Sequence, residues 1–432
     1  MWRDAAALAR GHSPRQLVLQ LTDRCNATCP QCSMRVSNPM SRTRMERAVA
    51  ARIVDHAAEL GVSALSITGG EPLLCVSDVQ FLVRRATEAG IRHTRTGTNG
   101  FVFSGADSRT FSTRIGRLAE GLAASGLRNF WISLDSADVE THERQRGLHG
   151  VVAGIEQALP IFHAAGLYPA ANLGLTRHLG RAPLPAMREV GADGFRAAVR
   201  DGLTAFFERV IGLGFTMANV CYPMSVSEEH QGLAPAYLAT SDAPLVRFTT
   251  TERGMLYATL AEVIAEQRPW IRVFTPLSSL DALGAQLRGG PSAACRGGVD
   301  YFFVDPHGDT YPCGYRGDEW LGPFVMFKPR RSGRPSCRRC DWECFRDPSE
   351  LLDPVTSPGR RRLPAARLLT GSDRRMRLWW QDVRYASACD LYDGRRPPDE
   401  ARLRRFAQTV RRHCQGSGHR QEPGQAVTPP AV

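Results

Sequence analysis

The stretch MERAVAARIVDHAAELGVSALSIT, residues 45–68, contains the structural unit that decides the fold. Residues 45–60 place apolar side chains three and four positions apart, as an amphipathic helix does. Gly61 follows, as a glycine commonly follows a helix, and the short run Ala64–Thr68 then has the length of a strand. The stretch therefore predicts a helix that leads directly into a strand.

This order of helix, glycine and strand recurs between residues 16 and 221. Strands are expected at Leu17–Leu19, Ala64–Thr68, Arg92–Thr98, Phe130–Leu134, Leu167–Leu173 and Phe215–Cys221. Helices are expected at Met45–Leu60, Val79–Ala89, Thr110–Ala124, Val151–Ala165 and Phe195–Leu213. The alternation implies parallel strands with right-handed crossovers. A closed eight-unit barrel takes ~250 residues, so we expect an α/β fold with a partial, TIM-like (β/α)6 barrel.

The remaining residues indicate smaller units. We expect the barrel core over residues 14–222, connecting elements over 223–294, a cysteine-rich domain over 295–350, a helical segment over 351–414 and a disordered tail over 415–432. Within them, helices are expected at Thr251–Gln267, Leu280–Leu287, Arg374–Ala386 and Asp399–His413, and a strand at Ile271–Phe274.

The net charge of +12 comes mostly from scattered arginines. Scattered charge favours a solvated surface, so we do not expect a nucleic-acid partner. No apolar run reaches the ~18 residues of a membrane helix, and the N-terminus lacks the apolar segment of a signal peptide. We therefore expect a cytoplasmic protein without a membrane partner.

Twelve cysteines in a chain without a secretion signal indicate metal ligands rather than disulfides. Cys25, Cys29 and Cys32 follow directly after the first expected strand. A closed [4Fe–4S] cluster uses four thiolates, so three cysteines on one loop would leave one iron free for another ligand. A structural zinc ion, the alternative, requires a fourth Cys or His, and none is nearby.

Polar residues follow the other expected strands. The second strand leads into Gly69-Gly70-Glu71-Pro72, and the third ends at Thr98-Asn99. The fourth carries Ser133 and Asp135, after which comes the run His142–Gly147. Because the carboxyl ends of parallel strands meet at one face of a barrel, these residues are expected to lie together there.

The cysteine spacing, the Gly-Gly-Glu-Pro turn and the Ser-Leu-Asp-Ser…Arg-Gly stretch together resemble the radical S-adenosylmethionine (SAM) superfamily over roughly residues 16–221. The resemblance implies a [4Fe–4S] cluster ligated by Cys25, Cys29 and Cys32. It also implies SAM contacts, namely Gly69, Gly70, Glu71 and Pro72 for the amino group, Ser133 and Asp135 near the ribose and methionine, Arg146 for the carboxylate, and Asn99 and Asn172. The chain departs from the family at Gln31, where many members have an aromatic residue.

The resemblance also implies the chemistry. An external one-electron donor of the flavodoxin or ferredoxin type would reduce the cluster, and SAM would then be cleaved to a 5′-deoxyadenosyl radical that takes a hydrogen atom from the substrate. Cys221, at the end of the sixth strand, is a candidate for returning a hydrogen atom. Buried packing is the commoner role of such a cysteine.

A second cysteine group begins with Cys295 and Cys313, which flank an expected hairpin at residues 301–311. Cys337, Cys340 and Cys344 follow closely. The pattern resembles the SPASM or shorter twitch extension of radical SAM enzymes, which implies an auxiliary [4Fe–4S] cluster. We expect one cluster on Cys295, Cys313, Cys337 and Cys340, with Cys344 as a substitute or extra ligand.

Two alternatives for the second cysteine group remain open. Two incompletely ligated clusters could recruit Cys344 and Cys389, and a zinc ribbon would also suit a hairpin followed by Cys-x-x-Cys. The substrate is open as well. Many radical SAM enzymes with auxiliary clusters modify peptides or proteins, so the resemblance favours a maturase-type oxidoreductase that acts on a peptide or protein. The alternatives are a dehydrogenase, dehydratase or epimerase of a small natural product, such as a sugar or aminocyclitol, and a non-enzymatic zinc or nucleic-acid-binding protein.

Overall fold

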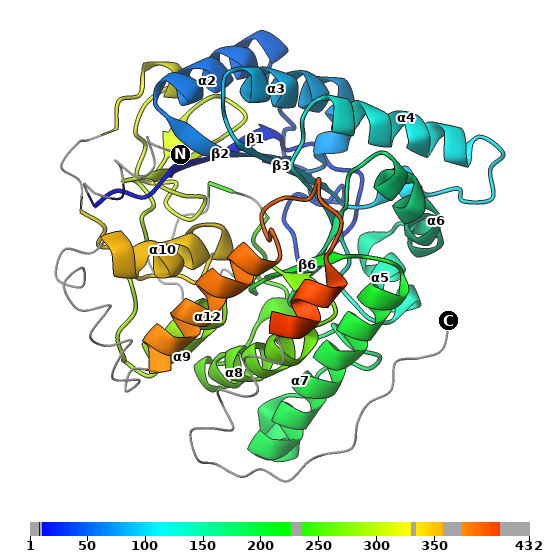
Figure 1. Ribbon diagram of the computed structural model, residues 1–432, viewed down its shortest axis with the longest axis vertical. Helices are drawn as coiled ribbons and strands as arrows, with labels where there is room; N and C mark the ends of the chain where they lie inside the picture. The colour runs from blue at the N-terminus through cyan, green and yellow to red at the C-terminus, as the bar shows by residue number, and fades with distance from the viewer. Residues whose placement is uncertain are drawn as a thin grey trace.

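The computed structural model describes residues 8, 11–223, 225, 236–237, 239–329, 334–356 and 374–406. These residues build one sheet of nine strands, which Figure 1 shows surrounded by helices. The strands are β1 (Arg15–Thr22), β2 (Val62–Gly69), β3 (His93–Thr98), β4 (Asn129–Ser133), β5 (Ala170–Gly174), β6 (Met217–Cys221), β7 (Arg272–Val273), β8 (Tyr301–Val304) and β9 (Thr310–Tyr311).

Across the sheet the strands run in the order β7-β6-β5-β4-β3-β2-β1-β8-β9. Neighbouring strands are parallel, apart from the antiparallel β8–β9 hairpin. Sequential parallel strands that lie side by side are the topology of a β/α barrel. The predicted fold class, a partial TIM-like barrel, is confirmed.

The main helices lie around this sheet (Figure 1). They are α2 (Arg47–Glu59), α3 (Val76–Glu88), α4 (Phe111–Ala124), α5 (Val139–Arg146), α6 (Val151–Ala164), α7 (Met187–Gly212), α8 (Thr250–Gln267), α9 (Leu277–Leu287), α10 (Glu343–Thr356) and α12 (Arg374–Ala388). Helix α7 begins before the expected Phe195 and is interrupted at Gly191, whose φ of 74° and ψ of 176° are not helical. Helix α5 was not among the expected elements.

The sheet crosses the domain boundaries expected from the sequence. Strand β7 pairs with β6, so the segment 223–294 adds a seventh strand to the barrel rather than only connecting it to the next domain. Strand β8, from the cysteine-rich segment, pairs along β1 from Gln16 to Leu19. The expected core and cysteine-rich segment thus share one continuous sheet, although their boundaries as domains stay predictions.

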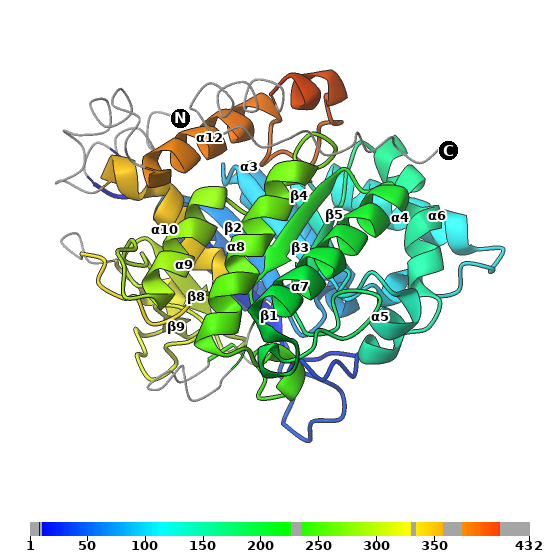
Figure 2. The ribbon, with the colours of Figure 1, turned by 90° about the horizontal axis from the view of Figure 1, so that it is seen from below.

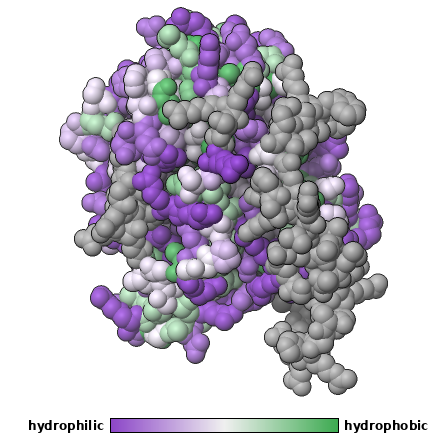
Figure 3. All heavy atoms as spheres, turned by 90° about the vertical axis from the view of Figure 1, so that its left-hand side faces the viewer, coloured by the Kyte–Doolittle hydropathy of each residue, from purple (hydrophilic) through white to green (hydrophobic). Residues whose placement is uncertain are grey.

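The C-terminal elements pack on the barrel at α9. Both α10 and α12 contact α9, and Figure 2 shows α12 running across the outside of the α9–α10 region. Residues 400–406 are helical, whereas residues 407–413 of the expected helix Asp399–His413 and the whole expected tail lie outside the described residues. In the part of the chain that the structure describes, no helix has the length and apolar character to cross a membrane. Figure 3 shows a mainly hydrophilic described surface on one face.

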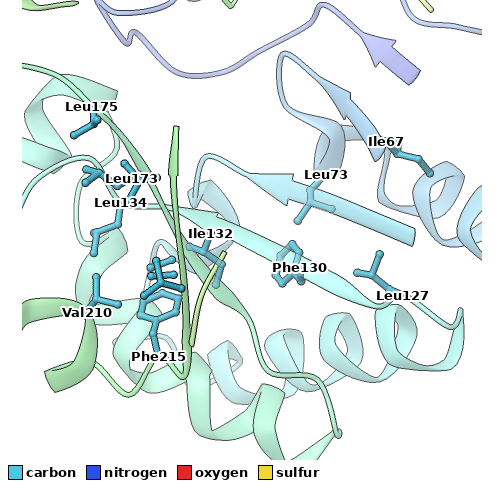
Figure 4. Packing of buried hydrophobic residues seen from close by; sticks show 14 of the residues in the cluster. Ile67, Leu73, Leu127, Phe130, Ile132, Leu134, Leu173, Leu175, Val210 and Phe215 are labelled. Atoms are coloured by element: carbon cyan, nitrogen blue, oxygen red, sulfur yellow. The ribbon is translucent and has the colours of Figure 1, made fainter. Parts of the chain in front are cut away.

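The two faces of the barrel sheet differ in chemistry. Side chains that point outward, such as Phe130 and Ile132 of β4, pack against the helices in one large apolar core (Figure 4). The alternate residues of the same strand, Asn129, Trp131 and Ser133, therefore point into the barrel. A complete TIM barrel fills its interior mainly with Val, Ile and Leu, so these inward residues indicate an interior built for a ligand.

Candidate active site

A cavity of about 200 Å³ lies at the carboxyl ends of the barrel strands. It is lined by most of the residues that the sequence indicated for SAM, together with the candidate hydrogen donor: Gly69, Gly70, Glu71, Pro72, Asn99, Ser133, Arg146, Asn172 and Cys221. Asp135 is not part of the lining, but it contacts Arg146. The structure therefore brings together side chains that come from five different strand ends, as a cofactor site requires.

The two glycines of the Gly-Gly-Glu-Pro turn pack against the chain that leads into the cysteine loop. A Cβ at Gly69 would lie 2.5 Å from the carbonyl oxygen of Thr22, and one at Gly70 would lie 2.4 Å from that of Arg24. The Gly70 N–H also donates to the Thr22 carbonyl at 2.8 Å. The glycines therefore allow a close approach of protein backbone, and this contact fixes the cysteine loop relative to β2.

Glu71 is fully buried behind this turn. Its carboxylate accepts hydrogen bonds from the N–H of Leu73 at 2.9 Å and from the N–H of Asn99 at 2.6 Å. Burial nevertheless raises the pKa of Glu71 to about 7, because removal from water penalises the charged form more than these bonds favour it. A ligand ammonium beside it would restore full ionisation.

The cysteine loop is held next to the cavity by polar contacts. The Asn99 amide lies 3.8 Å from the sulfur of Cys25 and donates to Asn26 at 2.9 Å. Burial raises the pKa of Cys29 to about 12 and that of Cys32 to about 11. Thiols in this environment become thiolates only when a metal displaces their protons, so their ionisation depends on a bound metal group.

Arg146 and Asp135 form a buried ion pair. The guanidinium donates in a bidentate manner, with Nε 2.9 Å from Oδ2 and Nη2 2.8 Å from Oδ1 of Asp135. Gln31, which stands where many family members have an aromatic residue, donates to the same carboxylate at 2.8 Å. The expected SAM-carboxylate partner is thus already paired within the protein, and Gln31 links this pair to the cysteine loop.

Helix α5 places the run His142–Gly147 beside the cysteine loop. The Nδ1 atom of His142 accepts the N–H of Asp135 at 3.1 Å, and burial lowers the pKa of this histidine to about 4. Gly147 ends the helix with a φ of 63°, and a Cβ there would lie 2.4 Å from the Thr28 hydroxyl. The Thr28 N–H donates to the Arg146 carbonyl at 2.9 Å. The run therefore anchors the cysteine loop from the side opposite to the glycines.

The second cysteine group assembles as the sequence indicated. Strands β8 and β9 form the expected hairpin, and the N–H of Cys295 donates to the Cys337 carbonyl at 2.7 Å. Cys295, Cys313 and Cys340 are buried in one aromatic cluster, and Cys337 packs against it; the aromatic members are Tyr301, Phe303, Tyr315, Trp342 and Phe345. Burial raises the pKa of Cys313 to about 12, with smaller contributions from neighbouring thiols.

Cys344 and Cys389 differ in their surroundings. Cys344 packs against the aromatic cluster, as Cys337 does, and also lines the cavity at the barrel mouth, where its thiol donates to Glu343 at 3.5 Å. Cys389 packs with Tyr385, Leu391 and Leu403 in a separate hydrophobic cluster. Cys344 as an extra ligand, and two clusters that recruit Cys344 and Cys389, stay predictions.

Glu343, the first residue of α10, was missed by sequence reasoning. Glu343 is buried beside Cys221 and Cys344, and one of its carboxylate oxygens, Oε2, has no hydrogen-bond partner within the described residues. Cys221 itself donates to the Asn172 side chain at 3.3 Å. The adjacency of Glu343 to Cys340 and Cys344 was the signal that the auxiliary segment reaches the barrel interior.

The donor chemistry of both cysteine groups fits an iron–sulfur cluster, because such clusters are held by cysteine thiolates. Among the residues that the structure describes, no three His, Cys, Asp or Glu side chains converge as the ligands of a single metal ion do.

This geometry defines a class of protein, a β/α barrel with a cysteine loop and a polar site at the carboxyl ends of its strands. Residues 19–176 match the model described as the radical SAM superfamily, so the chain contains a radical SAM domain. Its cofactors are accordingly a [4Fe–4S] cluster and SAM. The assignment excludes the non-enzymatic alternative.

Similar proteins carry several activities. The chain is 23% identical over 316 residues to the AdoMet-dependent heme synthase of Methanosarcina barkeri, covering 71% of this chain and 79% of that protein. It is 32% identical over 169 residues to a GTP 3′,8-cyclase of a Synechococcus species, covering 36% of this chain and 45% of the cyclase. It is 31% identical over 176 residues to the PqqA peptide cyclase of Granulibacter bethesdensis, covering 41% and 43%. The chain thus spans less than half the length of the two cyclases.

Among solved structures, native anSMEcpe with bound AdoMet is similar at 15% sequence identity and a TM-score of 0.49. The superposition covers 92% of this chain and 100% of that one.

Proposed function

We propose that this enzyme modifies a small molecule by hydrogen-atom abstraction inside the barrel. The observation that carries the proposal is a pair of adjoining cavities inside the barrel. One cavity lies at the carboxyl ends of the strands and a second of about 390 Å³ lies below it, and both are lined by Trp131, Glu343 and Cys344. Cavities of this size enclose small ligands, whereas a folded protein substrate needs an open surface.

Cys25, Cys29 and Cys32 are proposed as the cluster ligands, because the glycine turn and the Arg146-Gly147 corner hold their loop at the cavity mouth. When bound, the cluster and SAM supply one-electron cleavage of a C–S bond and a radical able to abstract hydrogen. Glu71 is proposed to bind the SAM amino group, because burial raises the pKa of its carboxyl and a neighbouring ammonium would favour the charged form. The electron donor is proposed to be a flavodoxin or ferredoxin.

The protein's own residues are proposed to orient SAM and to keep water out. Asn99 connects a cluster cysteine to the cavity wall, and Ser133 and Asn172 line the same wall. Arg146 is proposed to hold the SAM carboxylate while it remains bound to Asp135, since a guanidinium has five N–H donors and this pair uses only two of its nitrogens.

Cys221 is proposed as the group that returns a hydrogen atom to the substrate. Its sulfur lines the cavity beside Asn172, and burial raises the pKa of the thiol well above its usual value. A thiol that stays protonated keeps the S–H bond that such a transfer needs.

Cys295, Cys313, Cys337 and Cys340 are proposed to hold one auxiliary [4Fe–4S] cluster. Their common aromatic shell includes Trp342, which also lines the cavity at the barrel mouth. The auxiliary site therefore lies one residue from the substrate region, a position suited to electron exchange with a substrate radical.

Peptide modification is the second candidate, and the similarity to a PqqA peptide cyclase favours it. The test is anaerobic incubation of cluster-loaded protein with SAM, dithionite and a small-molecule extract of the source cells, with 5′-deoxyadenosine as the readout. We expect the low-mass fraction to stimulate 5′-deoxyadenosine formation at least tenfold. Stimulation by the peptide fraction alone would contradict the small-molecule proposal.

A further inference from the structure

The lower cavity lies at the amino-terminal ends of the barrel strands. It is lined by residues near the start of β1, β2, β3 and β4, including Gln16, Ala64, His93 and Asn129. It meets the upper cavity at Trp131, Glu343 and Cys344, which line both. The barrel is therefore hollow on the side opposite to the cysteine loop as well.

Buried hydrogen-bond donors around this cavity lack partners. Within the described residues, the unpartnered atoms are Nε and Nη2 of Arg95, Nδ2 of Asn129 and Nε1 of Trp131. Asn129 is only 6% exposed, so water at the protein surface does not satisfy it. A buried donor without a partner is energetically costly, so several of them around one cavity indicate a missing acceptor.

The three donor side chains converge because of the sheet register. Arg95 of β3 lies opposite Asn129 of β4, and Gly97 lies opposite Trp131. Side chains two residues apart point to the same face, so all three point into the barrel. The Arg95 guanidinium lies 5.2 Å from the centre of a Trp131 ring, which limits its position without pairing its N–H groups.

Two nitrogens of Arg95 are not taken up by the acidic groups of the cavity. The Nε and Nη2 atoms of Arg95 make no hydrogen bond within the described residues. Asp347 lines the same cavity and accepts a hydrogen bond from the Tyr222 hydroxyl at 2.9 Å, and burial raises its pKa to about 8, which favours the uncharged form near neutral pH. The guanidinium of Arg95 is therefore available to an anion.

We propose that the lower cavity binds an anionic group of the substrate, a phosphate or a carboxylate, through Arg95, Asn129 and Trp131. The adjoining part of the substrate then reaches Glu343 and Cys344, where the two cavities meet. The inference rests on the proposed function and adds its substrate class, a small molecule with an anionic end.

The test measures anion binding by anaerobic calorimetry on cluster-loaded protein with SAM, using inorganic phosphate in one arm and acetate in the other. Three variants are compared with the wild type: Arg95→Gln, Trp131→Phe, which keeps the ring but removes the N–H, and Arg52→Gln on the exposed face of α2 as the matched control.

We expect at least one anion to bind the wild type, at least tenfold weaker binding in Arg95→Gln, a severalfold loss in Trp131→Phe and no change in Arg52→Gln. Stronger binding of phosphate identifies a phosphate ester, and stronger binding of acetate identifies a carboxylate. Equal binding by wild type, Arg95→Gln and Trp131→Phe, or no binding of either anion to the wild type, overturns the inference.

The two proposals fail in different ways. If wild-type protein binds the anion through Arg95 but forms no 5′-deoxyadenosine, the proposed function fails and the anion site stands. If the wild-type protein forms 5′-deoxyadenosine but Arg95→Gln binds the anion as tightly as the wild type does, the anion site is wrong and the proposed function stands.

Discussion

The two cysteine groups of this enzyme show opposite designs. The N-terminal group has three cysteines on one loop, which backbone contacts hold beside the upper cavity. The C-terminal group offers four proposed ligands, Cys295, Cys313, Cys337 and Cys340, in or against a cluster of aromatic side chains, with Cys344 as a fifth cysteine packed against the same cluster. The difference suggests a division of labour, since an incomplete thiolate set beside a cavity suits reaction with a ligand and a complete set in an apolar shell suits stability or electron transfer.

The largest effect is expected when the three-cysteine loop loses a thiolate. Cys29→Ala should lower 5′-deoxyadenosine formation at least ~1000-fold, because two thiolates cannot retain a reactive cluster. The measurement is anaerobic product quantification by mass spectrometry. Cys75→Ala is the matched control, since Cys75 is buried in the apolar core and lines neither cavity. Comparable losses of activity in both variants would contradict a special role of the N-terminal thiolates.

The four-cysteine group should respond differently. Cys313→Ala is expected to lower iron from about eight to about four atoms per chain, the content of one cubane. Detectable 5′-deoxyadenosine formation should remain, since the first cluster is intact. Iron analysis and the cluster absorbance check this result. Unchanged iron content would remove the auxiliary site from the account.

The glycine turn should matter more than its lack of a functional group suggests. Gly70→Ala places a Cβ 2.4 Å from the Arg24 carbonyl, so the cysteine loop must shift. We expect roughly tenfold slower SAM cleavage, because a displaced site loses alignment. Gly116→Ala in α4 is the control, since its Cβ would meet no atom within 4 Å. Equal rates for the two variants would contradict a positioning role of the turn.

The smallest effect concerns pH and Asp347 in the lower cavity. Its pKa is raised by burial from 3.8 to about 8. The contribution of Asp347 to the free energy of unfolding is therefore complete below pH 3.8 and is lost as the pH rises through 8, by at most about 1.4 kcal/mol per pH unit. Asp347→Asn should flatten the decline of Tm between pH 5 and pH 8, as measured by anaerobic scanning fluorimetry. Parallel Tm profiles would show that the carboxyl is already ionised.

Much of the barrel follows from local sequence. The six expected strands were predictable because short apolar runs that follow glycines such as Gly61 and Gly126 are typical of buried strands. Helix α5 escaped notice because its buried residues are His142, Gln145 and Arg146, so it has no apolar stripe. The β1–β8 pairing was also missed, because contacts between residues nearly 300 positions apart leave no periodic signal.

The candidate site was predictable in its membership and not in its contacts. Residues at the strand ends, such as Glu71 and Asn172, gather because parallel strands share one carboxyl end. The ion pair between Asp135 and Arg146 depends on how α5 packs, which spacing does not reveal. Glu343 lines the cavity because α10 packs there, and no local sequence motif predicts this long-range contact.

The proposed chemistry requires that the three-cysteine cluster keeps one iron free for SAM. Electron–nuclear double resonance on the reduced Cys313→Ala protein, with SAM labelled with ¹⁵N at its amino group, measures this contact. We expect a resolved ¹⁵N coupling to the remaining cluster. A reduced cluster whose spectrum is unchanged by labelled SAM would contradict it.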